Sequence, residues 1–466
     1  MKRYGWLLGC CLFLSIGMLW AADEPDLRML QQKAAQSRDM EGYVGVCKYL
    51  YQTEENPELL LLYADSIHQL ATKSKKPEQL VEYYIWASEG NFIKGDFQQG
   101  YALKRKAIAL AEKAGLKFAI SQSCCDMGYY CNVDARYDSA RYYFRKGLEA
   151  GEDLSEAGEA CRTMLTNYAS SFLFEGKTDS ALVYTIRASE RSAADKDTAM
   201  LIENLNQLGT IYRRKKNLEN CIANFEQALH LCELRGNHNA VAFIYGNIAT
   251  AYCDWNRPVD AIPFSEKAVE YALKTGNKRR IGTCYVNLGA IQIRLVQMRA
   301  EGIATLLKAI PMLEEVNDRR LLCDAYNYLV NAYRMDGNLN QAMYYLQKLD
   351  KLAHEMQTDA ERFRYYQAKA GLLQESKNYT EAIVYYRRMI DMLRSGYKDT
   401  RDYEHYKRLA DCYLAVNNSS QAYEYLTQAY ALRDSAFHTE QTEQLSEYSV
   451  KYQTKEKELE IVTLRQ

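Results

Sequence analysis

Histidine and cysteine are the residues of this chain whose types could bind a metal ion or act in catalysis. His230, Cys232 and His238 are spaced so that they can approach one another at a helix end, which makes a metal site one alternative. None of the six histidines stands in an HExxH sequence, and no GxSxG, P-loop or GxGxxG sequence occurs. We therefore predict no catalytic residue, no metal ion, no cofactor and no enzymatic activity.

The composition indicates which elements must position any functional side chain. The 466 residues include only six prolines and 24 glycines, and 48% are hydrophobic, which excludes a collagen-like or mainly disordered chain. So few helix breakers predict an almost wholly helical protein. Lys and Arg (59) nearly balance Asp and Glu (60), so no basic field exists to attract nucleic acid.

A repeat of 40 or 41 residues organises the chain. One small residue recurs in the first helix of each unit, at Ser88, Gly128, Ala169, Gly209, Ala249, Gly289, Val330, Ala370 and Ala410. The second helix has its own small residue 12 positions later, or 13 in one unit, at Gly100, Ala140, Ala181, Cys221, Ala261, Gly302, Ala342, Ala382 and Ala422. Two helices cross closely only where side chains are small, so each pair of positions predicts a helical hairpin.

Residues 205–228 carry a resemblance to the tetratricopeptide repeat family. They contain Leu-Gly, then Tyr212, and then a small residue, Phe225 and Ala228 across a second helix. The family norm is 34 residues per unit, so these units are longer. The resemblance implies an all-α fold, a right-handed α-α superhelix of about nine to ten helical hairpins that forms one solenoid.

The repeats divide the chain into segments. Residues 81–441 form the predicted tetratricopeptide solenoid, and residues 23–80 form a capping helix with a degenerate repeat. Residues 442–466 form a charged helix with a loose heptad pattern, which is either a solvated cap or a coiled-coil stalk that makes a homodimer. This end also resembles the segment that joins a periplasmic repeat domain to a membrane helix in bacterial signalling regulators.

The resemblance implies that the first helix of each unit lines a concave groove. Amides recur two residues before the small position, where they could pair with the backbone of an extended peptide. The candidates for contact with a peptide are Asn167, Gln207, Asn247, Asn287 and Tyr328. Arg213, Arg294 and Arg334 follow on the same helices and could pair with carboxylates. Where chaperone-binding members of the family have clamp lysines, this chain has Thr163, Glu203, Phe243 and Thr283, which argues against that clamp here.

Residues 1–22 predict a secretory signal. Lys2 and Arg3 precede an apolar stretch that is shorter than the ~20 residues needed to span a bilayer, and Ala21 and Ala22 follow it. Lipidation at Cys10 is an alternative that would give a membrane anchor. Cleavage leaves eleven cysteines, which we predict to be buried thiols rather than disulfides.

These features together predict a non-enzymatic, exported, periplasmic repeat protein that binds a protein or peptide through its groove, as a scaffold or adaptor. The alternative is the extracytoplasmic sensor portion of a membrane-bound transcriptional regulator or histidine kinase whose membrane and effector parts are absent from this chain.

Overall fold

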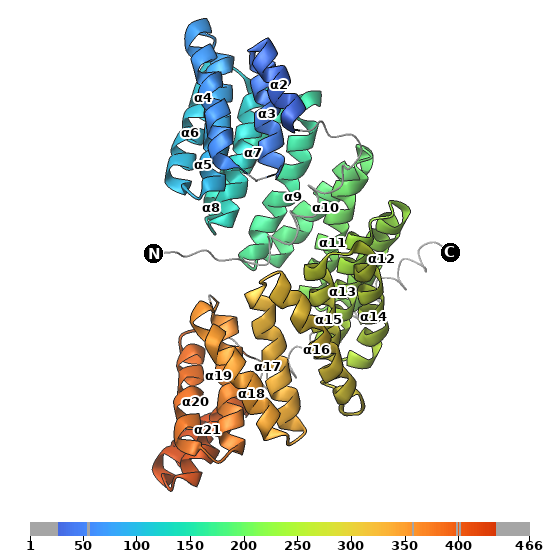
Figure 1. The fold of residues 1–466 in the computed structure, drawn as a ribbon, viewed down its shortest axis with the longest axis vertical. Helices are drawn as coiled ribbons and strands as arrows, with labels where there is room; N and C mark the ends of the chain where they lie inside the picture. The colour runs from blue at the N-terminus through green and yellow to red at the C-terminus, as the bar shows by residue number, and fades with distance from the viewer. Residues whose placement is uncertain (1–26, 54–55, 357, 398, 400–401, 435–466) are drawn as a thin grey trace, which may run out of the picture. The chain divides into compact units, whose positions relative to one another are not determined.

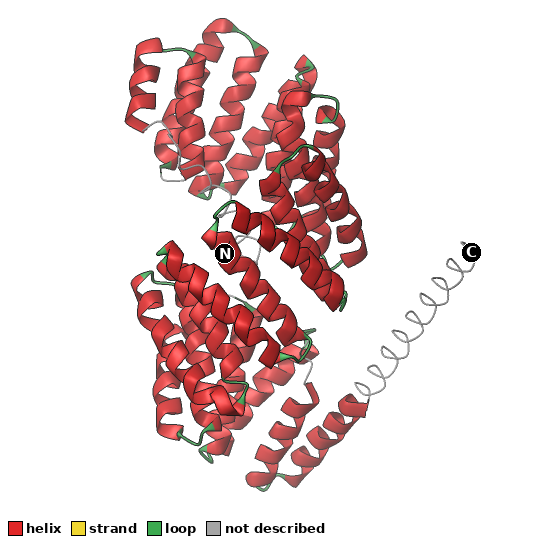
Figure 2. Cartoon of the chain, turned by 90° about the vertical axis from the view of Figure 1, so that its right-hand side faces the viewer, coloured by secondary structure: helices red, strands yellow, loops and turns green. Residues whose placement is uncertain are grey.

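A computed structural model describes residues 27–53, 56–356, 358–397, 399 and 402–434. The predicted signal at residues 1–22 and the charged segment at residues 442–466 lie outside the described residues. All regular secondary structure in these described ranges is helical (Figure 2). The prediction of an all-α fold built from helical pairs is confirmed.

The chain forms two compact units, residues 1–276 and 277–466. Consecutive helices within each unit lie side by side (Figure 1). The helices of unit 1 are α2 (Leu27–Ser37), α3 (Met40–Thr53), α4 (Pro57–Ser74), α5 (Pro77–Lys94), α6 (Phe97–Ala114), α7 (Lys117–Val133), α8 (Tyr137–Gly151), α9 (Gly158–Phe174), α10 (Thr178–Ala194), α11 (Thr198–Arg214), α12 (Leu218–Leu234), α13 (His238–Asp254) and α14 (Pro258–Thr275). A short 3₁₀ helix, η1 (Ser155–Ala157), precedes α9.

Unit 2 continues the same alternation of first and second helices. Its helices are α15 (Lys278–Gln292), α16 (Arg299–Glu315), α17 (Arg319–Met335), α18 (Leu339–Leu352), α19 (Asp359–Glu375), α20 (Tyr379–Arg394) and α21 (Asp402–Ala415), and residues 419–434 are also helical. Two 3₁₀ helices are η2 (Val296–Met298) and η3 (Ala353–Glu355). The single-residue insertion in the unit of Gly289 falls at η2, in the connection between two helices.

The small residues lie where the helices cross, as the spacing predicts. All nine small positions of the first helices are buried. A Cβ atom at Gly209 would lie 2.5 Å from the ring of Phe225, and one at Gly128 would lie 2.3 Å from the ring of Phe144. Each phenyl ring therefore occupies the space that the missing side chain leaves, and the two helices of the pair approach closely.

Short capped turns separate the helices. The side chains of Asp197, Asn217 and Asn237 accept hydrogen bonds from backbone N–H groups at the starts of α11, α12 and α13. Positive φ angles occur just before all three caps, at Lys196 (56°), Lys216 (55°) and Gly236 (64°). A left-handed residue ends one helix and the following cap begins the next, so successive helices reverse direction within a few residues.

The cysteines belong to the packed interior. All eleven cysteines of the described residues are free thiols, ten of them buried and Cys253 half-buried. Burial raises the pKa of the Cys284 thiol to about 11, so this thiol stays protonated near neutral pH. These residues behave as small apolar side chains.

A matched pair of glycine substitutions tests the close crossing. Gly209→Ala places a methyl group against Phe225, whereas Gly246→Ala on α13 meets no heavy atom within 4 Å. Both changes gain up to ~1 kcal/mol of helix propensity. We expect Gly246→Ala to be neutral or stabilising and Gly209→Ala to be destabilised by about 1–3 kcal/mol relative to it, because overpacking forces the ring to move. Urea unfolding measures both, and equal free energies of unfolding would contradict the packing.

Candidate functional site

The first helices of successive pairs contact one another in unit 1. α7 contacts α9, α9 contacts α11, and α11 contacts α13. Each is separated from the next by one antiparallel partner, so the first helices run in the same direction. We call the surface formed by α9, α11 and α13 the first-helix face. Side chains about one repeat apart, 37 to 41 residues, meet across this face.

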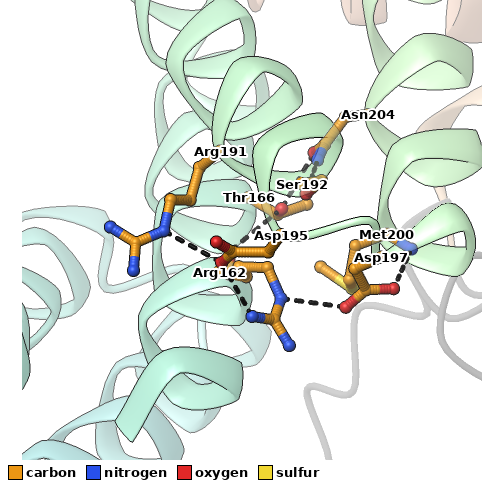
Figure 3. Close-up of polar contacts among 8 residues, drawn as sticks. All are labelled: Arg162, Thr166, Arg191, Ser192, Asp195, Asp197, Met200 and Asn204. Carbon is orange, nitrogen blue, oxygen red and sulfur yellow. Dashed lines mark hydrogen bonds and ion pairs between the residues drawn. The ribbon is translucent and has the colours of Figure 1, made fainter. Parts of the chain in front are cut away.

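An ionic network anchors the turn before α11 to α9 (Figure 3). The guanidinium of Arg162 donates to Asp197 Oδ2 and to Asp195 Oδ2, each at 2.9 Å. Arg191 of α10 also donates to Asp195, at 2.9 Å. Asp197 in turn accepts a hydrogen bond from the backbone N–H of Met200, at 3.1 Å. The first turn of α11 is therefore held by both helices of the preceding pair.

A second polar layer fixes the rotation of α11. Thr166 Oγ1 donates to Asn204 Oδ1 at 2.8 Å, and Asn204 Nδ2 donates to Ser192 Oγ at 3.1 Å (Figure 3). All three side chains are buried. Because Asn204 faces α9 and α10, the residues on the other side of α11 face α13.

Gln207 and Asn206 extend this polar layer in opposite directions. Gln207 Nε2 donates to Ser170 Oγ at 2.7 Å, and its carbonyl oxygen accepts from Thr185 Oγ1 at 3.2 Å. On the α13 side, Asn247 Nδ2 donates to Asn206 Oδ1 at 2.7 Å. A row of hydrogen-bonded amides and hydroxyls thus crosses the first-helix face.

Two buried polar atoms of this face have no hydrogen-bond partner among the described residues. They are Asn167 Nδ2 on α9 and Glu203 Oε2 on α11. Only 8% of Glu203 is exposed, and burial raises the pKa of its carboxyl to about 8. Glu203 precedes both Asn206 and Gln207 by one helical turn, so its position on α11 lies between the stripe that faces α13 and the stripe that faces α9 and α10.

The structure places the predicted contact residues of unit 1 in different environments. Asn167 and Gln207 are 3% and 4% exposed, and Gln207 is bonded to neighbouring helices. Asn247 is half-buried at the α13 side of the first-helix face. Arg213 pairs with Asp254 at 3.5 Å. The row of predicted contact residues is therefore packed on α9 and α11, and it becomes accessible to solvent at α13.

The predicted contact residues of unit 2 are more exposed. Asn287 lies exposed on α15, and Arg294 is exposed in the turn that follows this helix. Tyr328 is half-buried on α17. Arg334 of α17 forms an ion pair with Glu375 of α19, so its charge is used between first helices. Contact of these residues with a ligand stays a prediction.

Glu203 is the residue of the first-helix face that the sequence reasoning did not select. In the sequence, its charge is opposite to that of the lysine that a clamp needs at this position. A stronger signal is available in the sequence, because the rest of the central part of α9, α11 and α13 is uncharged. The burial of the carboxylate depends on how these three helices pack, which no single segment reveals.

A second set of buried charges lies between α5, α6 and α7. Lys104 is fully buried and forms ion pairs with Glu89 and with Asp126, the latter at 2.9 Å. The hydroxyl of Tyr130 donates to Glu89 at 2.7 Å. Burial alone lowers the pKa of Lys104, but the two carboxylates outweigh it and hold the pKa above its ordinary value. Each charge in this cluster therefore has a partner within unit 1.

Removing this cation should destabilise the protein strongly. Lys104→Met leaves two carboxylates in a buried site, and we expect a loss of about 3–5 kcal/mol at pH 7. Without Lys104, burial raises the pKa of Glu89 further. Above the ordinary pKa of a glutamate, the folded variant therefore keeps a proton on Glu89 that the unfolded chain has released. The deficit should shrink as the pH falls from 7 to 5. Urea unfolding at both pH values measures this, with the exposed Lys113→Met as the control; a deficit independent of pH would contradict the electrostatic origin.

The comparisons with known proteins agree with this architecture. The model of the tetratricopeptide repeat family matches residues 200–274. This segment covers most of α11, all of α12 and α13, and α14 up to Lys274. This segment is of the tetratricopeptide repeat type. The family fold is typically non-catalytic. No curated protein matches the chain.

Several solved structures are similar to this repeat protein. A signal transduction ATPase with a tetratricopeptide repeat sensor, from Pyrococcus horikoshii, aligns with a TM-score of 0.52 and 16% identity over 82% of this chain and 54% of that one. The chain thus spans about half the length of that protein. The quorum sensor NprR from B. thuringiensis gives 0.49 and 16% over 70% and 92% of the two chains. Aspartyl phosphate phosphatase F from Bacillus subtilis gives 0.46 and 16% over 70% and 87%. The first of these shows a shared fold.

The structure also addresses the metal alternative. Within the described ranges, no group of three His, Cys, Asp or Glu side chains is placed to hold a metal ion. His230, Cys232 and His238 therefore do not form one, and Cys232 is fully buried in the core. None of the described helices is both long enough and apolar enough to cross a membrane.

Proposed function

We propose that this repeat protein binds a protein or peptide partner on its first-helix face and acts as a scaffold or adaptor rather than as an enzyme. The observation that carries the proposal is the row of amides and hydroxyls across α9, α11 and α13, together with two buried polar atoms that have no partner in the described residues. Buried polar atoms are favourable only when they are hydrogen-bonded, so these two atoms can gain a hydrogen bond from a polar ligand on this face.

An extended peptide has the chemistry that suits this face. Its backbone presents N–H and C=O groups in alternation, and an amide side chain can both donate and accept. The half-buried Asn247 and the exposed Thr250 lie on the accessible α13 side, where a peptide backbone can reach them. The packed layer behind them holds these side chains in place and limits the entropy lost on binding.

Alanine at Asn247 should weaken binding without unfolding the protein. The variant loses the side chain that faces the peptide, and with it one hydrogen bond to Asn206. At about 1 kcal/mol per hydrogen bond, we expect the affinity for the peptide to fall three- to tenfold. The measurement is retention of a library of N-acetylated, C-amidated nonapeptides by the full chain, with thermal unfolding in parallel. Asn287→Ala tests the equivalent position in unit 2.

Gln227→Ala provides the matched control for these variants. Gln227 is an exposed amide on α12, a second helix, so its loss should leave peptide retention unchanged. Equal retention by the wild type, Asn247→Ala and Asn287→Ala would rule out the amide positions as contact residues. A chain that retains no peptides at all would contradict the proposed function itself.

The proposal includes export, which rests on the signal-like residues 1–22. We expect a soluble periplasmic polypeptide that lacks these residues, and intact-mass measurement after cell fractionation tests this. Replacing the apolar residues 11–14 (CLFL) with charged ones should keep the uncleaved chain in the cytoplasm, because a signal needs its apolar stretch. A heavier, membrane-bound polypeptide would favour the sensor alternative, in which a signalling module accompanies the repeats.

A further inference from the structure

Glu203 is the only charged side chain in the central part of the first-helix face. The other side chains of α9, α11 and α13 that carry a charge, histidine included, lie within the first five or the last two residues of these helices: Glu159, Arg162, Arg213, Arg214, His238 and Asp254. The central tyrosines Tyr168 and Tyr245 are neutral near pH 7, because burial raises the pKa of each hydroxyl above its ordinary value. The residues around Glu203 are apolar or carry amides and hydroxyls. A single acidic group therefore lies in an otherwise uncharged wall.

The nearby arginines already form ion pairs or hydrogen bonds with other groups. Arg162 is bound to the carboxylates of Asp195 and Asp197 at the start of α11. At the other end of α11, Arg214 donates to the backbone carbonyl of Leu173 at 2.7 Å, and Arg213 pairs with Asp254. The shift in the pKa of Glu203 has burial as its only cause, so no cation of the described chain compensates the carboxylate.

A buried carboxylate without a cation is costly, because ionisation in a desolvated site is opposed and the acid keeps its proton instead. A group of opposite charge brought by a ligand removes that cost and forms a charge-assisted hydrogen bond. We propose that Glu203 recognises the terminal cation of a lysine or arginine side chain in a peptide held on the first-helix face. This assignment rests on the proposed function and names the side-chain class that the face selects.

The geometry favours a long basic side chain over a metal ion. One carboxylate alone does not hold a metal, and the described residues contain no group of three suitable ligands. Because Glu203 is only 8% exposed, the cation must arrive on a slender stem that can insert between α11 and α13. Phe243 lies one turn before Asn247 on the stripe of α13 that faces α11, where an aliphatic stem can pack against its ring.

The test uses capped nonapeptide libraries on the full chain. Each library fixes the central residue as arginine, lysine, citrulline or norleucine and mixes uncharged residues elsewhere. Citrulline has the shape of arginine without its charge. We expect the arginine and lysine libraries to bind roughly tenfold or more tightly than the uncharged libraries, as a charge-assisted hydrogen bond provides. Spermidine, a small polyamine, is tested as a competitor.

Glu203→Gln keeps the size of the side chain and removes the charge. We expect this variant to bind the arginine and citrulline libraries equally, and Glu226→Gln, at an exposed position on α12, to keep the full preference. Because Glu203 is largely protonated at pH 7 in the free protein, binding of the cation must release its proton. Wild-type affinity for arginine peptides should therefore rise between pH 6 and pH 8, by at most about tenfold per pH unit, whereas affinity for citrulline peptides stays constant.

The outcomes separate this inference from the proposed function. Equal binding of charged and uncharged libraries by the wild type would overturn the role of Glu203 and leave peptide binding standing. A preference for arginine that persists in Glu203→Gln would also overturn it. Tight binding of spermidine with no preference among peptides would identify a polyamine site instead. If Glu203→Gln does not fold, the pH dependence of the wild type decides: a flat profile for arginine peptides overturns the assignment.

Discussion

The close crossing of two helices at a residue without a bulky side chain is the constraint on which the rest of the structure depends. At Gly209 the ring of Phe225 occupies the position that a Cβ would need, and Phe144 does the same at Gly128. Because this position recurs every 40 or 41 residues, the same kind of helical pair is repeated along the chain. Equivalent side chains of neighbouring first helices consequently meet, and a row of similar residues becomes a continuous wall.

Close approach has a consequence for the polar residues of that wall. When first helices pack tightly, an amide between them loses water and must find a partner in the protein. Gln207 finds Ser170 and Thr185, and Asn204 finds Thr166 and Ser192. These bonds fix the register of α11 against its neighbours. The proposed binding of a ligand then depends on the polar groups that the packing does not use.

The sequence predicts the repeat period, the helix pairs and the buried small positions, because each of these depends on spacing alone. It does not predict which of the recurring amides are accessible to solvent. Asn247 and Gln207 hold the same place in their repeats, yet one is half-buried and the other is packed against hydroxyls of α9 and α10. The difference arises from the small polar residues on the neighbouring helices, which let α11 approach closely, and these lie about 20 and 40 residues away in the chain. Accessibility is a property of three helices together.

The two buried acidic sites of unit 1 show why the unpaired one is informative. Glu89 lies in the interior with Lys104 beside it, and Tyr130 donates a further hydrogen bond, so the chain itself supplies the compensating groups. Glu203 is buried to a similar degree and receives none of these from the described residues. A fold that can provide a buried lysine at one acidic position has no physical obstacle to providing one at another. The absence of a cation at Glu203 lowers the stability of unit 1 as the pH rises from the ordinary pKa of a glutamate to about 8, because over this range the unfolded chain releases a proton that the folded site keeps. A stability cost of this kind, on the surface where first helices meet, is the behaviour of a recognition residue rather than of a packing residue.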